Sequence, residues 1–140
     1  MRSRIAAVLA ATLTVVMLGA CTSRPQAQVS NTASVTVNGN DATIHVVRCS
    51  QLEQYRTIYI GSDFAGATVV IDQRAQPLTA ESVRIQNLGG FTGLYSHGDG
   101  GDADMRLNGD KFTITGTANG YKTDKPNEPA TAAFKIVTTC

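Results

Sequence analysis

Three cysteines are the residues of this chain whose chemistry is most informative. They are Cys21, Cys49 and Cys140 in a sequence of 140 residues. A cysteine thiol can accept a lipid, form a disulfide or bind a metal, and an odd number of cysteines in an exported protein indicates that one of them stands apart. The sequence around Cys21 identifies which one.

The first twenty residues have the composition of a signal peptide. Arg2 and Arg4 give a positively charged start, and an uncharged apolar run extends from Ile5 to Leu18. This run is shorter than the roughly 20 apolar residues that a membrane-spanning helix needs. It fits the apolar region of a leader that is removed after export, so we expect residues 1–20 to be a signal peptide.

The end of this leader distinguishes a lipoprotein from an ordinary secreted protein. Leu18-Gly19-Ala20-Cys21 resembles the bacterial lipobox, in which small residues admit the scissile bond to a narrow protease site and the thiol accepts a diacylglyceryl group. Cleavage then makes Cys21 the mature N-terminus. Two or three acyl chains anchor stably, because each buried methylene contributes about 0.8 kcal/mol. We expect Cys21 to be the lipid anchor, on the extracytoplasmic face of a membrane; the alternatives are a simple signal peptide with a chance cysteine and a cytosolic protein.

The stretch after Cys21, TSRPQAQVSNTAS, is polar and has almost no large apolar side chains. Such a composition cannot bury enough surface to order itself, which predicts a flexible spacer. We therefore divide the chain into a signal peptide (1–20), a lipidated N-terminus with spacer (21–33) and a folded domain (34–140). The hydroxyl groups of the spacer permit O-linked sugars, and an unmodified tether is the alternative.

The domain is composed of short β-rich runs separated by turn signals. Asn38-Gly39 favours a hairpin, because both central positions of a type I′ turn favour positive φ, and Asn108-Gly109-Asp110 marks a second one. One helical turn at most is expected, at Ser50–Glu53. In the last run Phe134 and Ile136 should face inward and Lys135 outward. The predicted strands are 35–37, 43–49, 55–60, 67–71, 82–86, 91–95, 104–107, 112–115 and 132–138.

Seven to nine strands without the spacing of βαβ units predict an all-β fold. We expect a small antiparallel β-sandwich, with a partly open barrel as the alternative. With Cys21 assigned to lipid, Cys49 and Cys140 remain in an oxidising compartment, where a disulfide is the expected outcome. It would attach the C-terminus to the sheet and contribute roughly 4–5 kcal/mol in the chain-entropy model. Two free thiols are the alternative.

Several segments resemble the mycobacterial lipoprotein antigen family typified by LpqH. Phe112–Gly120, Phe134–Cys140 and Val46–Cys49 match family segments in order and spacing, and the lipobox agrees. The resemblance implies an actinobacterial cell-envelope lipoprotein without known enzymatic chemistry. It also implies acylation of Cys21, the cysteine pair Cys49 and Cys140, and recognition by host lipopeptide receptors. The spacer is shorter and poorer in Thr than in the type member, so the resemblance leaves the glycosylation of this chain open.

Other polar residues have the types found in metal and catalytic sites. Ser96–Asp104 has the carboxylates of a calcium loop, but it lacks the EF-hand order and the distal Glu, and a solvated glycine-rich loop is the alternative. Ser96, His97 and Asp99 have the residue types of a hydrolase triad, yet residues this close in sequence seldom converge with triad geometry, and no Gly-x-Ser-x-Gly elbow exists. His45 lies in an apolar alternating run, which favours a packed or edge histidine. We expect no catalytic residue, metal site or cofactor.

Two functions remain open from the sequence. The first is a membrane-anchored surface antigen that makes host contacts without catalysis. The second is an envelope module that binds or carries lipid or glycolipid, with Ile58, Ile60, Val69 and Ile71 lining an apolar groove; the alternative for these four residues is that they fill the core. Nucleic acid is not an expected partner, because removing Arg2 and Arg4 from 12 basic residues leaves 10 against 11 acidic ones.

Overall fold

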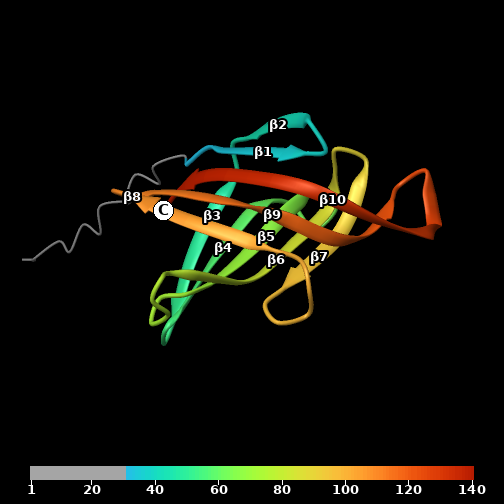
Figure 1. Ribbon diagram of the computed structural model, residues 1–140. Coiled ribbons are helices and arrows are strands. Elements are labelled where there is room, and N and C mark those ends of the chain that lie inside the picture. The colour runs from blue at the N-terminus through green and yellow to red at the C-terminus, as the bar shows by residue number, and fades with distance from the viewer. Residues whose placement is uncertain (1–30) are drawn as a thin grey trace, which may run out of the picture.

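The computed structural model describes residues 31–140, which form ten β-strands and no helix (Figure 1). The predicted signal peptide, Cys21 and most of the predicted spacer lie outside these residues. No helix of the described part is long and apolar enough to cross a membrane. The strands are β1 (Ala33–Val37), β2 (Asn40–Ile44), β3 (Val47–Leu52), β4 (Tyr55–Gly61), β5 (Gly66–Asp72), β6 (Thr79–Leu88), β7 (Phe91–Ser96), β8 (Ala103–Asn108), β9 (Lys111–Lys122) and β10 (Lys125–Thr139).

All ten strands belong to one antiparallel sheet with the order β2-β1-β10-β9-β7-β6-β5-β4-β3. The strand β9 has 12 residues and is long enough to pair with two strands on the same side. Its first half, Lys111–Gly116, pairs with β8, and its end, Asn119–Lys122, pairs with β7. The sheet therefore branches at β9, and β8 forms a short edge there.

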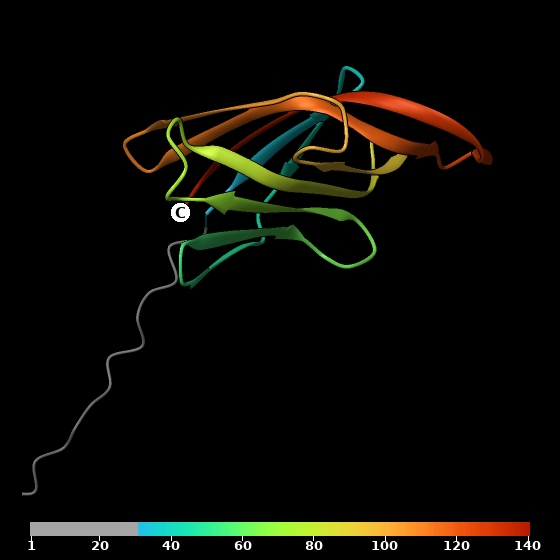
Figure 2. The ribbon, with the colours of Figure 1, turned by 60° about the horizontal axis from the view of Figure 1, so that its bottom comes forward.

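The sheet is rolled so that its two edges approach each other. The strands β2 and β3 lie at opposite ends of the sheet, yet only His45 and Val46 separate them in sequence. Three residues of extended chain span about 10 Å, so the two edges must approach each other at this crossing. The backbone N–H of Gly61 donates a hydrogen bond of 2.8 Å to the carbonyl oxygen of Val46. Figure 2 shows the resulting layers, with β9 and β10 lying across from β3 and β4.

The interior of this rolled sheet is filled with apolar side chains. Alternation along β10 places Phe134 and Ile136 inside, with 4% and 0% exposure, and leaves Lys135 exposed, as predicted. Successive side chains of a strand point to opposite faces, so the core takes alternate residues from the central strands. The edge strands β2 and β3 contribute only the partly buried Ile44 and Val47. The largest fully buried side chains are Phe91, Phe112, Ile58, Ile71, Ile85, Ile114 and Ile136.

The turn signals are placed as the sequence predicts. Asn38 and Gly39, with φ of 49° and 80°, connect β1 to β2, and Gly109, with φ of 66°, lies between β8 and β9. The helical turn expected at Ser50–Glu53 is wrong. Here β3 continues through Leu52, which pairs with Tyr55, and Glu53 turns the chain with φ of 53°. Pairing with β4 decides the conformation, because four residues give too little local helical preference to compete.

The predicted all-β antiparallel fold is confirmed. Of the two arrangements left open, the single rolled sheet corresponds to the partly open barrel. There are ten strands instead of seven to nine. The run predicted as one strand over 43–49 is divided at His45 and Val46 into β2 and β3, because the chain changes from one edge of the sheet to the other at this point.

Candidate functional site

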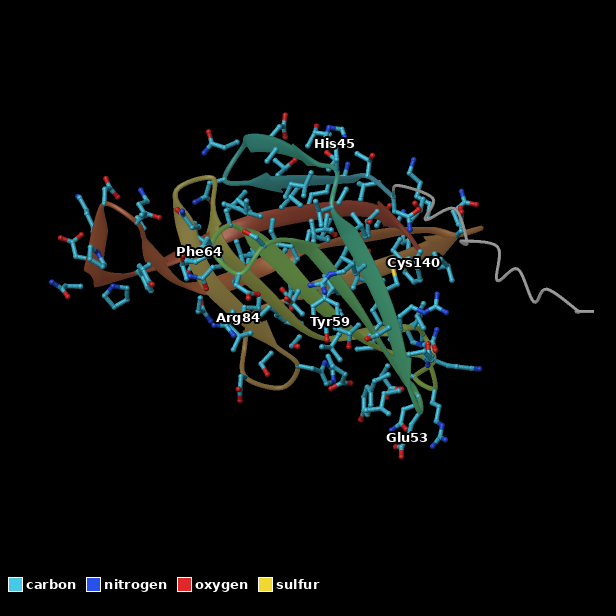
Figure 3. All side chains as sticks on the ribbon, turned by 180° about the vertical axis from the view of Figure 1, so that it is seen from behind. His45, Glu53, Tyr59, Phe64, Arg84 and Cys140 are labelled. Atoms are coloured by element: carbon cyan, nitrogen blue, oxygen red, sulfur yellow. A yellow bond between two sulfur atoms is a disulfide. The ribbon has the colours of Figure 1, made fainter. Side chains whose placement is uncertain are left out.

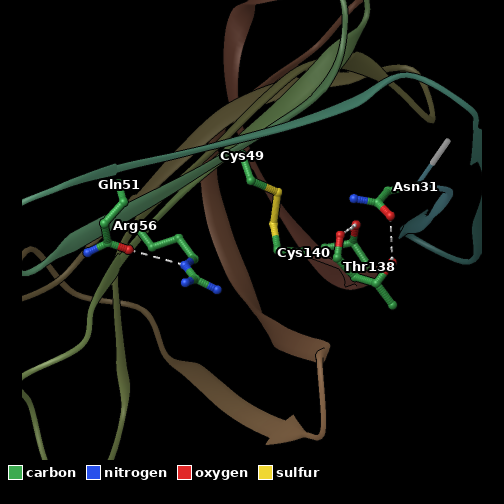
Figure 4. The surroundings of a disulfide bond; sticks show 7 residues. Asn31, Cys49, Gln51, Arg56, Thr138 and Cys140 are labelled. Atoms are coloured by element: carbon green, nitrogen blue, oxygen red, sulfur yellow. Dashed lines mark hydrogen bonds between the residues drawn. A yellow bond between two sulfur atoms is a disulfide. The ribbon is translucent and has the colours of Figure 1, made fainter. Parts of the chain in front are cut away.

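The predicted disulfide between Cys49 and Cys140 is present (Figure 4). The two Cα atoms are 6.1 Å apart, and the residues are 91 positions apart in sequence. Cys49 lies on the edge strand β3, and Cys140 follows β10, which lies near the other edge of the sheet. The bond therefore closes the seam of the barrel covalently, close to the crossing at His45 and Val46.

The described chain begins beside this disulfide. The hydroxyl of Thr139 donates a hydrogen bond of 3.4 Å to Asn31 Oδ1, and the backbone N–H of Cys140 donates to the carbonyl oxygen of Asp110 at 3.3 Å. On the other side of the disulfide, Arg56 Nε donates to Gln51 Oε1 at 3.3 Å, as Figure 4 shows. The segment that leads toward Cys21 thus joins the domain at the seam, where β1, β3 and β10 come together.

The four residues proposed to line an apolar groove are part of the core. Ile58, Ile60, Val69 and Ile71 are each 2% exposed or less. Ile58 pairs with Val69 across β4 and β5, and all four side chains point into the filled interior. This supports the core interpretation of these residues over an apolar groove.

The polar stretch Ser96–Asp104 extends from the last residue of β7 across the connection to the second residue of β8. Backbone contacts order it: Asp99 N–H donates to the Ser96 carbonyl at 3.1 Å, and His97 N–H donates to the Glu81 carbonyl at 2.8 Å. Within residues 31–140, no side-chain hydrogen bond joins Ser96, His97 and Asp99. No group of three or more His, Cys, Asp or Glu in this range is arranged to hold a metal ion. The geometry is that of a glycine-rich loop.

His45 is not in a strand, in contrast to the prediction. It lies exposed in the crossing between β2 and β3, and its Nδ1 is 3.5 Å from Thr32 Oγ1. The sequence gives no local sign of this crossing, because Thr43–Cys49 alternates like a continuous strand.

A hollow on the outer face of β6, β7 and the end of β9 has no signal in the sequence. It has a volume of about 440 Å³, and Arg84, Leu94 and Tyr121 are among the residues that line it. A smaller hollow of about 190 Å³ adjoins it beneath the β4–β5 turn and shares Arg84 and Gln86. Alternation predicts the face of strand 82–86 on which Arg84 lies and the face of strand 91–95 on which Leu94 lies. It does not predict that the two residues are neighbours. Only the register, in which Arg84 pairs with Leu94, brings them together.

Comparison with known families gives a match over residues 26–140 to the family described as Mycobacterium 19 kDa lipoprotein antigen. The chain belongs to this family.

Individual relatives agree with the assignment to the 19 kDa lipoprotein antigen family. A protein of Mycobacterium avium subsp. hominissuis, named a lipoprotein, is 66% identical over 140 residues, which cover the whole chain and 97% of that protein. The lipoprotein LppE of Mycobacterium tuberculosis is 31% identical over 108 residues, 77% of each chain. The lipoprotein LpqH of Mycobacterium avium is 32% identical over 108 residues, 76% of this chain and 66% of that one.

The segments that carry the family resemblance build the scaffold of the barrel. Phe112–Gly120 lies within β9, the branching strand, and Phe134–Cys140 includes the end of β10 and its disulfide cysteine. Val46–Cys49 leads from the seam crossing to the other disulfide cysteine. In this chain, the family pattern therefore coincides with the elements that close the sheet, and it does not mark the hollow around Arg84.

Proposed function

We propose that this protein is a membrane-anchored lipoprotein of the cell envelope, acylated at Cys21, whose β-domain acts as a surface antigen on the extracytoplasmic side. The observation that carries the proposal is the family match over residues 26–140 behind a lipobox at Leu18–Cys21. Relatives of this chain are named lipoproteins. An anchor of two or three acyl chains is strong enough to retain a domain of this size.

The position of the folded domain supports the proposed division of the chain. The first strand begins at Ala33, one residue before the expected domain start, and Asn31 already contacts Thr139. After removal of a signal peptide over 1–20, a lipidated spacer over 21–33 would connect the bilayer directly to the seam of the barrel.

The proposed role is contact without catalysis. In the described residues, Ser96, His97 and Asp99 have no mutual side-chain hydrogen bonds, which a triad would need to activate its nucleophile. The filled interior disfavours the second function, a carrier of lipid or glycolipid, because buried core residues occupy the space inside the sheet. Host lipopeptide receptors are the proposed partners of the acylated N-terminus.

The anchor is tested by Cys21→Ala in a mycobacterial host. We expect the variant to lose globomycin-sensitive processing and to leave the membrane fraction for the medium. Cys49→Ala is the matched control: it removes a different cysteine, keeps the lipobox, and should stay in the membrane fraction. If Cys21→Ala were retained in the membrane like the wild type, the anchor proposal would be wrong. Reporter cells carrying lipopeptide receptors should respond to the wild type and not to Cys21→Ala.

A further inference from the structure

Exposed apolar side chains are concentrated on one side of the barrel. In the described residues, eight large hydrophobic side chains are exposed. Six of them belong to the outer side of the layer formed by β3 to β7 and the end of β9 (Asn119–Lys122): Leu52, Tyr55, Tyr59, Phe64, Leu94 and Tyr121. Together with Arg48 and Arg84 they form a surface that we call the arginine–aromatic face. Figure 3 shows Tyr59, Phe64 and Arg84 on this side.

The register of the sheet brings the two arginines into one row of this face. Arg48 pairs with Tyr59, Tyr59 with Thr68, Thr68 with Arg84, and Arg84 with Leu94. Directly paired residues point to the same side of a sheet, so the row is continuous. The guanidinium carbon of Arg48 lies 5.5 Å from the centre of the Tyr59 ring.

Phe64 protrudes from this face on a well-ordered turn. It is 86% exposed, at the tip of the connection between β4 and β5. The backbone N–H of Ser62 donates to the Ala65 carbonyl at 3.0 Å, and the N–H of Ala65 donates to Ser62 Oγ at 3.3 Å. These bonds hold the turn in a conformation that keeps the ring in water. A large apolar ring presented in this way, among other apolar groups, indicates a contact surface.

The charges of the face are available to a partner. In residues 31–140, neither Arg48 nor Arg84 forms an ion pair; the two ion pairs are Arg106–Asp104 and Lys125–Glu128. Carboxylates also lie on or beside the face: Asp63 lines the small hollow together with Arg84, and Asp72 pairs with Tyr55. In the described residues none of them forms an ion pair with the two guanidinium groups, which lie in the row through Tyr59 and Thr68.

The opposite side of the barrel is polar. The outer side of β8, β10 and the first half of β9 has a hollow lined by Asp104, Arg106, Thr113, Thr115 and Lys135. Asp104 and Arg106 form one of the ion pairs of the described chain, 3.5 Å apart. The two sides thus differ in chemistry, and only one of them combines exposed rings with unpaired arginines.

The tether reaches the domain at the edge of the arginine–aromatic face. Arg48 is adjacent to Cys49, whose disulfide leads to Cys140 and so to Asn31 beside Thr139. From Cys21 to Asn31 the chain spans at most about 35 Å. The 15 residues of β10 alone extend over about 50 Å. A domain anchored through Cys21 therefore stays within about one molecular length of the bilayer.

We propose that the arginine–aromatic face docks on the bilayer that holds the Cys21 anchor. Phe64 enters the interfacial region, the Tyr and Leu side chains lie at the level of the headgroups, and Arg48 and Arg84 meet phosphates of anionic lipids. This inference rests on the proposed lipid anchor. Docking would turn the polar side, with β8 and β10, away from the membrane and toward external contacts.

The absence of tryptophan from the sequence provides a direct test. F64W introduces a single fluorophore on the face, and L107W introduces one at a 49% exposed position on β8, outside the face. Each mature acylated variant is reconstituted into vesicles of phosphatidylcholine and phosphatidylglycerol that contain brominated lipid. We expect blue-shifted, strongly quenched emission for F64W and the emission of an indole in water for L107W.

The outcomes separate docking from anchoring. If the protein does not float with the vesicles, the proposed lipid anchor is wrong, and this result is distinct from a failure of docking. If the protein floats but F64W is quenched no more than L107W, the docking proposal is wrong. A blue shift of F64W that is equal with and without lipid would indicate a second copy of the chain on the face and would also overturn it. In F64W, the double change R48E/R84E should reduce the quenching while circular dichroism remains unchanged.

Discussion

Cys49 and Cys140 have the clearest structural task of any pair of residues in this chain. Their bond joins an edge strand to the end of a strand from the other side of the sheet, where backbone pairing of the described strands stops. The same bond lies beside the residues through which the N-terminal segment joins the domain. A change at either cysteine should therefore act on the stability of the barrel and not on a reaction.

Cys140→Ser should lower the free energy of unfolding by about 2–5 kcal/mol, because the unfolded chain is no longer constrained by a long disulfide loop. Urea denaturation of the wild type and the variant measures the difference. Reductant should bring the wild type to the midpoint of the variant and leave the variant unchanged. Equal midpoints without reductant would show that the bond contributes nothing.

Tyr95 gives a residue-scale prediction about pH. Burial, with smaller contributions from the carboxylates of Asp102 and Glu81, raises the pKa of its phenol above the ordinary value of 10.0. The unfolded chain then loses this proton at lower pH than the folded one, so the contribution to stability is complete below pH 10 and is lost as pH rises through the folded pKa. Urea midpoints should fall above pH 10 less steeply in Tyr95→Phe than in the wild type. Identical slopes would contradict the assignment.

At the scale of elements, β9 organises the barrel. It pairs with β10 along its length, with β8 at its start and with β7 at its end. Its inward residues Phe112, Ile114 and Ala118 are at most 1% exposed. The family resemblance carried by Phe112–Gly120 is thus explained by packing, since this strand holds both branches of the sheet.

Ile114→Ala should lower the free energy of unfolding by about 2–5 kcal/mol, because it removes buried methyl groups and leaves a cavity between Met105 and Ile136. Lys111→Ala, an exposed change on the same strand, should stay within about 0.5 kcal/mol. Thermal unfolding followed by circular dichroism compares the two. A loss for Ile114→Ala no greater than that for Lys111→Ala would mean that β9 is not the centre of the core.

Local patterns were enough to predict most of the elements. Alternation along 132–138 and the Asn38-Gly39 turn predicted both the position and the facing of residues, because each depends on its immediate neighbours in sequence. The crossing at His45 and Val46 was not predictable in this way. It depends on the pairing of β2 with β1 and of β3 with β4 at opposite edges of the sheet, which nothing between Thr43 and Cys49 encodes.

The same distinction between local sequence signals and long-range pairing applies to the sites. Cys21 belongs to a contiguous motif, and Cys49 and Cys140 form a pair by elimination, so both were open to prediction. The arginine–aromatic face depends on register between strands that are distant in sequence. Arg48 and Arg84 come into one row through Tyr59 and Thr68 only after β3 to β6 have paired.

At the scale of the whole molecule, the two ends and the two sides of the barrel have distinct proposed roles. The seam joins the domain to the proposed lipid tether, and the hairpin between β9 and β10 lies at the other end of the barrel (Figure 1). One side would lie on lipid through Phe64 and its neighbours. The other would remain accessible, which is where an antigen of a cell envelope would make its contacts.

The central claim, an acylated Cys21 in front of a disulfide-closed barrel, is tested most directly by the intact mass of the protein isolated from mycobacterial membranes. We predict a chain that starts at Cys21 and carries a diacylglyceryl group. Its mass should also lack the two hydrogens that the Cys49–Cys140 bond removes. A chain that retains residues 1–20, or one that begins elsewhere with an unmodified Cys21, would contradict the account.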